Sequence, residues 1–205
     1  MKTLALLGTT LGFAFAAGLN LYATVLVVGG TIRLGWITLP SHLSSLAVLS
    51  DTTVLTVAGA LYVVEFLADK IPAVDHVWDG LHTVVRPLGA AWIAWRTIGG
   101  SGLPEPVEVA FLLAAGGVAL STHAGTAGTR LATASAGGHF LGLGIVLSLL
   151  EDAVAFVLAP LSLLMPILVL VFVVVGLIVA FLMARVAWRI IRRRRAARAA
   201  AAAAP

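Results

Sequence analysis

The chain has 205 residues, of which 60% are hydrophobic and only 11% are charged, and its formal net charge is +4. Soluble globular domains carry about 25% charged residues. The segment Leu161–Ala184 has no charged residue over 24 positions, which exceeds the roughly 20 residues needed to cross a hydrocarbon core. The composition therefore excludes an ordinary soluble domain and predicts an all-α integral membrane protein. Cysteine is absent, which excludes disulfides and thiolate chemistry.

Hydropathy predicts six transmembrane helices. The first begins like a secretory signal peptide, with Ala14-Phe15-Ala16 as a small-x-small cleavage site. Its apolar run continues to Val28, which favours an uncleaved helix, with a predicted break at Asn20 beside Gly18. The six expected spans are about Leu4–Val28, Thr53–Ala68, Asp75–Ile98, Val107–Ser121, Phe140–Leu158 and Leu161–Ile191.

The segments between the spans carry their own signals. Residues His42–Ser50 predict a short amphipathic or re-entrant piece. Proline is expected to stop the second span at Pro72, to kink the third at Pro87 and to break the fifth at Pro160, because it removes a backbone donor and clashes with the preceding turn. The fourth span is expected to continue to Ala134, as a helix or a broken helix.

The basic residues predict the orientation. With six spans, both termini lie on the same side of the membrane. That side would hold Lys2, Lys70, Arg130 and the arginine tail, whereas the other would hold Arg33 and Arg96. Because short cytoplasmic loops are enriched in lysine and arginine, we expect both termini in the cytoplasm.

The positive net charge belongs to the end of the chain. Seven of the 13 basic residues are arginines at or after Arg185, and the rest of the chain carries six basic against nine acidic side chains. An arginine run can bind nucleic acid, but directly after an apolar span it favours an anchor beside anionic lipid. We therefore expect a single transmembrane domain over residues 1–191, followed by a basic, then Ala-rich, cytoplasmic tail over residues 192–205. No nucleic-acid partner is expected.

A short internal repeat is visible. The string Ala17–Leu21 resembles Ala127–Leu131, and in each half a helix with an acid follows, at Glu65 and Glu151. A unit of three spans would place residues 4–98 and 107–191 in opposite directions across the membrane. The sequence thus predicts a 3+3 inverted repeat, which is the plan of many secondary transporters.

Ionisable residues are concentrated between positions 65 and 86. On a helix, the positions i, i+4, i+7 and i+11 share one face, and here they are Asp75, Asp79, His82 and Arg86. Glu65 and Asp69 share a face of the preceding helix, so the two polar faces are expected to pair. A metal site made of Asp75, Asp79 and His82 is an alternative, as is an intramembrane enzyme on the same face. Both are less favoured, because acids at this spacing are common on solvated faces.

The acids deep within the spans are the main functional candidates, because a charged residue at the bilayer centre costs about 2.5–3.5 kcal/mol on insertion scales. Glu151 and Asp152 lie in the middle of the fifth span, and Arg130 is their nearest cationic candidate. The residues expected to line a solute or ion pathway are Asn20, Glu65, Asp69, Asp79, Arg86, Arg130, Glu151 and Asp152. The alternative is structural, with buried pairs that fix the helix register.

Several short strings occur in a fixed order: AGLNLY at 17–22, VEFLADKIP at 64–72 with Val74-Asp75, Arg86-Pro87, and SLLED at 148–152. Together they resemble the bacterial multi-pass membrane family called domain of unknown function 4126, over about residues 5–165. That family usually reads His-x-x-Lys-Ala-x-x-Arg in its fourth helix region. Here His123 and Arg130 fit, but Thr126 replaces the lysine, which puts in doubt any pairing role of that residue. The resemblance implies a bacterial inner-membrane protein and brings no activity with it.

The leading interpretation is a small transporter or channel of a bacterial inner membrane. The alternative is a non-catalytic membrane scaffold or assembly protein, whose buried ion pairs are structural. An enzyme is less favoured, and no cofactor is predicted. The expected partners are the lipid bilayer, anionic lipid at the arginine tail, an unidentified small solute or ion and, as an open alternative, further copies of the chain.

Overall fold

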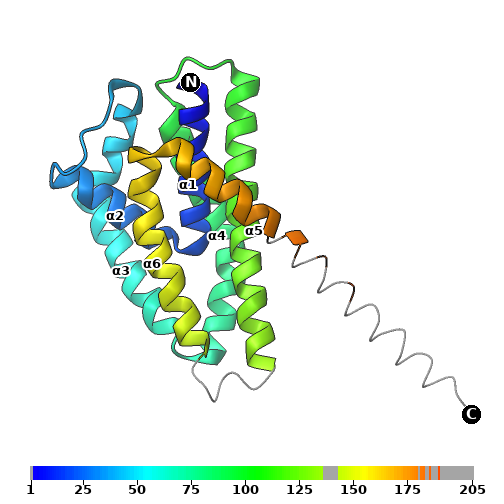
Figure 1. Ribbon diagram of the computed structural model, residues 1–205. Coiled ribbons are helices and arrows are strands. Elements are labelled where there is room, and N and C mark those ends of the chain that lie inside the picture. Colours follow the sequence, from blue (N-terminus) through cyan, green and yellow to red (C-terminus); the bar gives the residue numbers. More distant parts are fainter. Residues whose placement is uncertain (1, 136–142, 180, 183–184, 186–188, 190–205) are drawn as a thin grey trace, which may run out of the picture.

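The computed structural model describes residues 2–135, 143–179, 181, 182, 185 and 189, and every regular element among them is a helix. The labelled elements are α1 (Lys2–Leu19), α2 (Leu21–Arg33), the 3-10 helix η1 (Ser41–Ser50), α3 (Thr52–Ala68), α4 (Pro72–Ile98), α5 (Glu105–Ser135) and α6 (Leu143–Leu164). A further helix, Pro166–Val179, follows α6. Figure 1 shows that α3, α4, α5 and α6 form a bundle with α1 among them.

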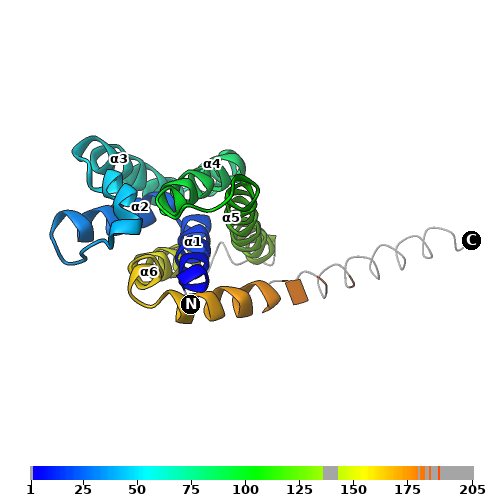
Figure 2. The ribbon, with the colours of Figure 1, turned by 90° about the horizontal axis from the view of Figure 1, so that it is seen from above.

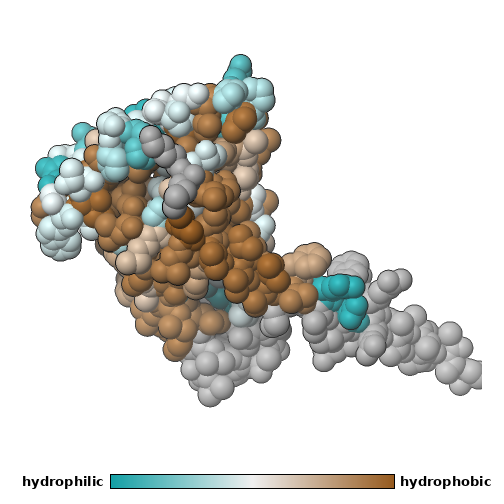
Figure 3. Space-filling view, turned by 45° about the horizontal axis from the view of Figure 1, so that its top comes forward, coloured by the Kyte–Doolittle hydropathy of each residue, from teal (hydrophilic) through white to brown (hydrophobic). Residues whose placement is uncertain are grey.

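Two helical stretches of the described chain are long and apolar enough to cross a membrane. They are Glu105–Arg130 and Gly144–Leu164, and η1 with α3 adds a third candidate if this pair, bent by 59°, counts as one span. Apolar side chains such as Val77, Leu88 and Leu113 are more than half exposed on the outside of the bundle, and brown apolar surface dominates one face in Figure 3. An all-helical fold with two or three candidate membrane spans is thus confirmed, and its exposed apolar side chains indicate contact with lipid. Six spans and the inverted repeat stay predictions.

The predicted first span, Leu4–Val28, consists of two helices. Asn20 adopts an extended backbone (φ −152°, ψ 110°), and its side chain accepts a hydrogen bond from the backbone N–H of Ala23. Asparagine is a preferred N-cap because its side-chain oxygen satisfies a free donor in the first turn. The break therefore falls at the predicted residue, and α2 leaves α1 at an angle (Figure 1).

The segment between α2 and α3 is ordered by capping contacts. The predicted piece His42–Ser50 is the 3-10 helix η1, which buries Leu43, Leu46 and Leu49. The Arg33 guanidinium donates to the Ser50 carbonyl at 3.0 Å and to the Thr52 hydroxyl at 2.9 Å. These contacts tie the end of α2 to the start of α3.

The three proline predictions differ in outcome: α3 ends before Pro72 as predicted, α4 continues through Pro87, and the break at Pro160 is absent. Pro72 is the first residue of α4, where its missing N–H has no intrahelical partner to lose, and α3 has already ended at Ala68. The prediction that Pro160 breaks a helix is wrong, because α6 continues through it to Leu164. The interruption falls at Met165, because the residue before a proline, here Pro166, disfavours the helical conformation.

The helix Pro166–Val179 crosses the bundle instead of continuing α6 (Figure 2). It packs on α1 through glycines: a Cβ at Gly8 would clash with the backbone of Pro166, and one at Gly12 would meet Val169 at 2.5 Å. The rings of Phe15 and Phe172 meet edge to face, with centroids 6.0 Å apart. The predicted span Leu161–Ile191 is therefore interrupted at Met165, and its first four residues belong to α6. Part of its second half and the tail over residues 192–205 lie outside the described chain.

Small side chains hold α1 against its neighbours. Ala14, Ala16 and Ala17 of α1 are fully buried, as is Ala119 of α5, and Ala90 of α4 is almost so. A Cβ at Gly18 would lie only 2.6 Å from the carbonyl oxygen of Ala119. The upper part of the bundle is therefore a close-packed apolar seam around α1.

Candidate functional site

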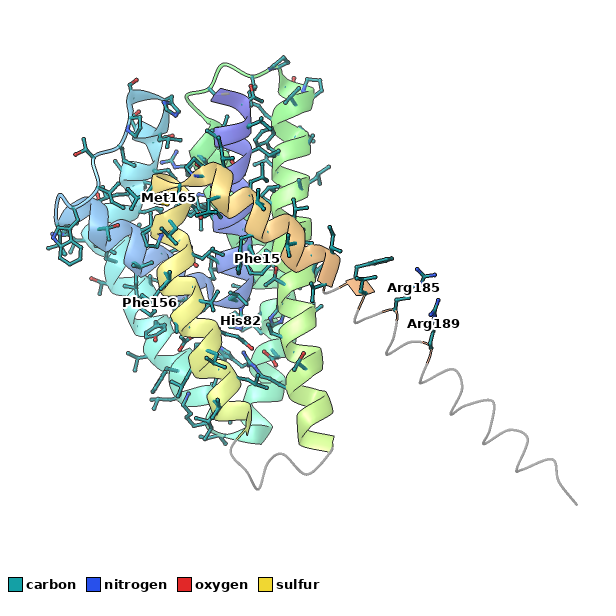
Figure 4. All side chains as sticks on the ribbon, viewed as in Figure 1. Phe15, His82, Phe156, Met165, Arg185 and Arg189 are labelled. Atoms are coloured by element: carbon teal, nitrogen blue, oxygen red, sulfur yellow. The ribbon has the colours of Figure 1, made fainter. Side chains whose placement is uncertain are left out.

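The α1–α2 break lies above a group of buried polar side chains. In Figure 1, α1 ends about halfway along α4 and α5, and α2 turns aside there. The space below the end of α1 receives side chains from α3, α4, α5 and α6, and Figure 4 shows His82 of α4 pointing into this region. We call this group the buried network. It consists of Asn20, Tyr22, Tyr62, Glu65, Asp69, Asp79, His82, Arg86, His123, Arg130, Ser148, Glu151 and Asp152.

Arg86 is the centre of the upper part of the buried network. Its Nη2 donates to Glu65 Oε1 at 2.5 Å, and the two side chains are only 2% and 1% exposed. Its Nη1 donates to the carbonyl oxygen of Gly18 at 2.9 Å and to His123 Nδ1 at 3.0 Å. One guanidinium thus joins α3, α4, α5 and the carboxyl end of α1.

The hydrogen bonds assign both ring nitrogens of His123 and one ring nitrogen of His82. An arginine can only donate and a carbonyl can only accept. His123 Nδ1 faces Arg86 and its Nε2 faces the backbone carbonyl of Asp79 at 2.9 Å, so His123 is neutral with its proton on Nε2. His82 Nδ1 faces the carbonyl of Trp78 at 2.8 Å, and its Nε2 lies 3.1 Å from the Tyr22 hydroxyl. His82 therefore carries a proton on Nδ1, and its Nε2 accepts from Tyr22 in the neutral form.

Arg130 is the centre of the lower part. Its guanidinium donates to both carboxylate oxygens of Glu151, which is the partner that the sequence predicts. Its Nη1 lies 3.4 Å from Asp79 Oδ1 and 3.8 Å from Asp69 Oδ1. Ser148 donates to the other Asp69 oxygen at 2.5 Å. Three carboxylates from α3, α4 and α6 therefore share this one guanidinium.

Asp152 turns away from Glu151 toward the break. Asn20 Nδ2 donates to Asp152 Oδ1 at 2.9 Å, and the Tyr62 hydroxyl donates to Asp152 Oδ2 at 3.3 Å. Adjacent helix residues point about 100° apart, which explains why the two acids have separate partners.

At the break, the C-terminal end of α1 lies beside a positive side chain and the N-terminal end of α2 beside a negative one. The carboxyl end of a helix carries a partial negative charge and the amino end a partial positive charge. Arg86 binds the Gly18 carbonyl at the end of α1, and Asp152 is bound to Asn20, the N-cap of α2. The break therefore places two half-helix ends at the network, which is how discontinuous helices build ion and substrate sites in transporters.

The buried network carries an excess of negative charge. Five carboxylates, Glu65, Asp69, Asp79, Glu151 and Asp152, face the two guanidiniums of Arg86 and Arg130. The excess is three formal charges, and Lys70, whose ammonium lies 3.9 Å above the Phe66 ring, offsets one at most. Burying charge without compensation is strongly unfavourable, so such groups take up protons or bind cations.

Two atoms of the central ion pair have no hydrogen-bond partner among the described residues. They are Glu65 Oε2 and Arg86 Nε, both buried. The pair is therefore held by a single hydrogen bond, and not by the two parallel bonds that a guanidinium and a carboxylate can form. One oxygen of the most deeply buried acid is left free.

All eight predicted pathway residues belong to the buried network, and their role stays a prediction. The weak metal alternative gains no support: the described residues contain no group of three His, Cys, Asp or Glu placed to hold a metal ion, and the side chain of Asp75 lies outside the described part. His82 instead binds Trp78 and Tyr22.

Four members of the buried network are missing from the predicted site: Tyr22, Tyr62, His123 and Ser148. Tyrosine, serine and a lone histidine are unremarkable inside an apolar helix, so hydropathy gives no reason to select them. The strings AGLNLY and SLLED and the pattern around His123 contain three of them. Thr126, at the position of the expected lysine, donates to the His123 carbonyl of its own helix at 3.0 Å.

Comparison with known proteins gives one match. The family model described as "Domain of unknown function (DUF4126)" matches residues 7–186. No curated protein and no solved structure matches the chain.

Proposed function

The chain belongs to the DUF4126 family, and because that description names no activity, we propose a function from the geometry: a small multi-pass transporter or channel of the cell inner membrane. Its pathway passes the buried network. The transported species is a small solute or an ion, and the groups that meet it are the charged side chains around Arg86 and Arg130 together with Asn20.

The excess of buried carboxylates is the observation that carries this proposal. A scaffold that only needs fixed helix register is served by balanced pairs, because each unpaired charge removed from water costs several kcal/mol. The two or three formal negative charges that the basic side chains leave over must be balanced by bound protons or cations. We propose that these protons or cations enter and leave. A site that binds such species inside a membrane protein is the working part of a pump, channel or transporter.

The network is also one-sided, which supports a transport role. It extends from Asp69, at the end of α3, up to Gly18 at the end of α1. Above it, Ala16 and Ala17 of α1 pack against the neighbouring helices with no exposed surface. A buried polar site that apolar packing seals on one side fits alternating access, and we propose that it is reached from the other side, near Asp69.

The proposed topology keeps both termini in the cytoplasm and a single domain over residues 1–191, with repeats over 4–98 and 107–191. Each half contributes one Glu–Arg pair, Glu65 with Arg86 and Arg130 with Glu151, which favours related halves. The strings that suggested the repeat differ in backbone, because α1 ends at Leu19 while α5 continues through Arg130.

The scaffold is the second candidate, and one observation favours it: both arginines and both glutamates are already paired. The transporter and the scaffold predict different effects of Glu151→Gln on transport and on stability. In a transporter, the variant keeps its shape and loses a charge that the transported species needs. In a scaffold, removing one partner of a buried pair costs about 3–5 kcal/mol and has no transport to affect.

The test uses the purified full chain in liposomes, with imposed gradients of protons, Na⁺ and K⁺ in separate runs. We expect wild-type flux of at least one cation, and loss of that flux in Glu151→Gln. Glu105→Gln, at an exposed position in the first turn of α5, is the matched control and should keep the flux. No wild-type flux of any cation, together with a lowered melting temperature of Glu151→Gln, would establish the scaffold.

A further inference from the structure

We propose that the coupling ion of this transporter is the proton, that Glu65 carries it on Oε2, and that its binding releases α3 from α4. This inference rests on the proposed function and adds to it the ion, the residue that binds the ion and the helix that moves.

The chemistry of the buried network favours a proton over a metal cation. A metal ion in a protein needs several oxygen or nitrogen ligands around it, and the described residues offer no group of three acids or histidines that would supply them. A proton needs a single free oxygen. Glu65 Oε2 is such an atom: it is buried, it has no hydrogen-bond partner among the described residues, and its side chain is 1% exposed.

The step is a simple protonation. A proton from the aqueous side adds to Oε2, the carboxylate becomes a neutral carboxylic acid, and no other covalent bond changes. Asp69 lies one turn from Glu65 on the same helix, nearer the end of the bundle, and bonds to Ser148. It gives the proton an intermediate acceptor between the bundle end and Glu65.

Arg86 keeps its place when Glu65 becomes neutral. The Gly18 carbonyl and His123 Nδ1 hold its Nη1 from two other helices. Protonation therefore removes the charge attraction between α3 and α4 without freeing the guanidinium. The groups that interact with the Glu65 charge are Tyr22, Tyr62, Asp69, His82, Arg86 and Asp152. His123 is linked to Glu65 only through Arg86.

The packing of α3 makes it the mobile partner. It packs mainly against α2 and much less against α4. Above the Glu65–Arg86 pair, an open apolar groove of about 320 Å³ lies among α2, α3 and α4, and its lining includes Tyr22, Val25, Ala58, Leu61, Trp92 and Ile93. Besides the Glu65–Arg86 ion pair, the described residues show one more polar contact between α3 and α4. His82 Nε2 lies 4.0 Å from Glu65 Oε1. The ion pair therefore fastens α3 at its lower end.

The test measures the distance between α3 and α4 as the pH changes. Because the chain has no cysteine, spin labels can be placed at Thr56→Cys and Leu88→Cys, two exposed positions on α3 and α4. We expect the distance distribution in wild-type background to shift to longer values on acidification across about pH 8 to 4, the range in which histidine and carboxyl groups titrate. A label pair at Leu88→Cys and Leu113→Cys, on α4 and α5, is the control that should not shift.

Variants assign the proton to its carrier. Glu65→Gln mimics the neutral acid, so it should show the long distance at every pH. If this variant does not fold, Glu65→Gln with Arg86→Gln removes both charges and takes its place. His82→Gln should keep the pH response. A wild-type distance that ignores pH, a response that survives in the Glu65 variants, or one that is lost in His82→Gln overturns the proposal.

The two proposals fail in different ways. Absence of any cation flux in wild-type liposomes removes the transport function, whatever α3 does. Flux of Na⁺ or K⁺ without proton flux keeps the transporter and rejects the proton. Proton flux that persists in Glu65→Gln keeps proton transport and rejects Glu65 as the carrier.

Discussion

Replacing Gly18 with alanine tests whether backbone contact fixes α1 at the break. A Cβ at this position would lie 2.6 Å from the carbonyl oxygen of Ala119 and 2.8 Å from Cβ of Thr122. Because the nearest atom is backbone of a packed helix, it cannot rotate away. Restoring an ordinary contact of 3.4 Å would require α1 and α5 to separate by roughly 0.8 Å, against close packing.

The expected cost follows from two opposing terms. Overpacking of a close-packed site costs typically about 1–3 kcal/mol, while replacing a helical glycine with alanine returns about 0.5–1 kcal/mol. We therefore expect Gly18→Ala to lower the free energy of unfolding by about 0–2.5 kcal/mol. Gly125→Ala, on α5 with no atom within 4 Å of its Cβ, has only the favourable term and should be neutral or stabilising.

The assay is unfolding of both variants in detergent micelles by titration with a denaturing detergent, followed by circular dichroism. The same preparations can be tested for flux, because a shift of α1 moves the Gly18 carbonyl away from Arg86 Nη1, now 2.9 Å distant. We expect a lower midpoint and reduced flux for Gly18→Ala alone. Equal midpoints for the two variants would refute the view that α1 and α5 are in rigid contact at this point.

Two more outcomes follow from the buried charges. Arg86→Met should lower the free energy of unfolding by about 3–5 kcal/mol, because it leaves Glu65 buried and unpaired. Adding Glu65→Gln to this variant should recover part of the lost stability. If the effects of the two substitutions simply add in the same micelle assay, the two residues are not a coupled pair. Thr126→Lys restores the lysine that the family pattern expects and places a cation one turn from Arg130 on α5. Because this cation would offset part of the negative charge of the buried network, the variant should take up fewer protons than wild type on acidification, as measured by potentiometric titration. Unchanged proton uptake would show that residue 126 does not contribute to the charge balance of the network.

Hydropathy predicted where the helices lie because an apolar segment in lipid must satisfy its backbone hydrogen bonds internally, which a helix does. It placed α3 within one residue at its start and at its end. It also found the break at Asn20, because asparagine next to glycine is a local signal for a cap. It failed at Pro160, where α6 continues, because a proline inside a membrane helix is tolerated when neighbouring groups satisfy the freed carbonyl.

The pairing of the acids was only partly predictable. Spacing along one helix identified the face of Asp79, His82 and Arg86, and the scarcity of cations left Arg130 as the partner of Glu151. The partner of Glu65 depends on how α3 meets α4, and that of Asp152 on where α1 ends beside α6. Such contacts are set by tertiary packing, which no periodicity in the sequence encodes.

The packing also decides which helix can open the one-sided network. A path through the membrane must cross either the seam around α1 or the boundary between α3 and α4. Opening the seam separates Gly18 from Ala119, and this buried contact is too close for small adjustments because interiors are packed to crystal density. The boundary between α3 and α4 contains an open apolar groove, and the direct ion pair across it is Glu65–Arg86, whose strength depends on a carboxyl charge. Further polar contacts at this end of α3 and at Asp69 go to α5 and α6. Movement of α3 therefore requires the loss of far fewer contacts than movement of α1, and it is the movement that a proton on Glu65 would control.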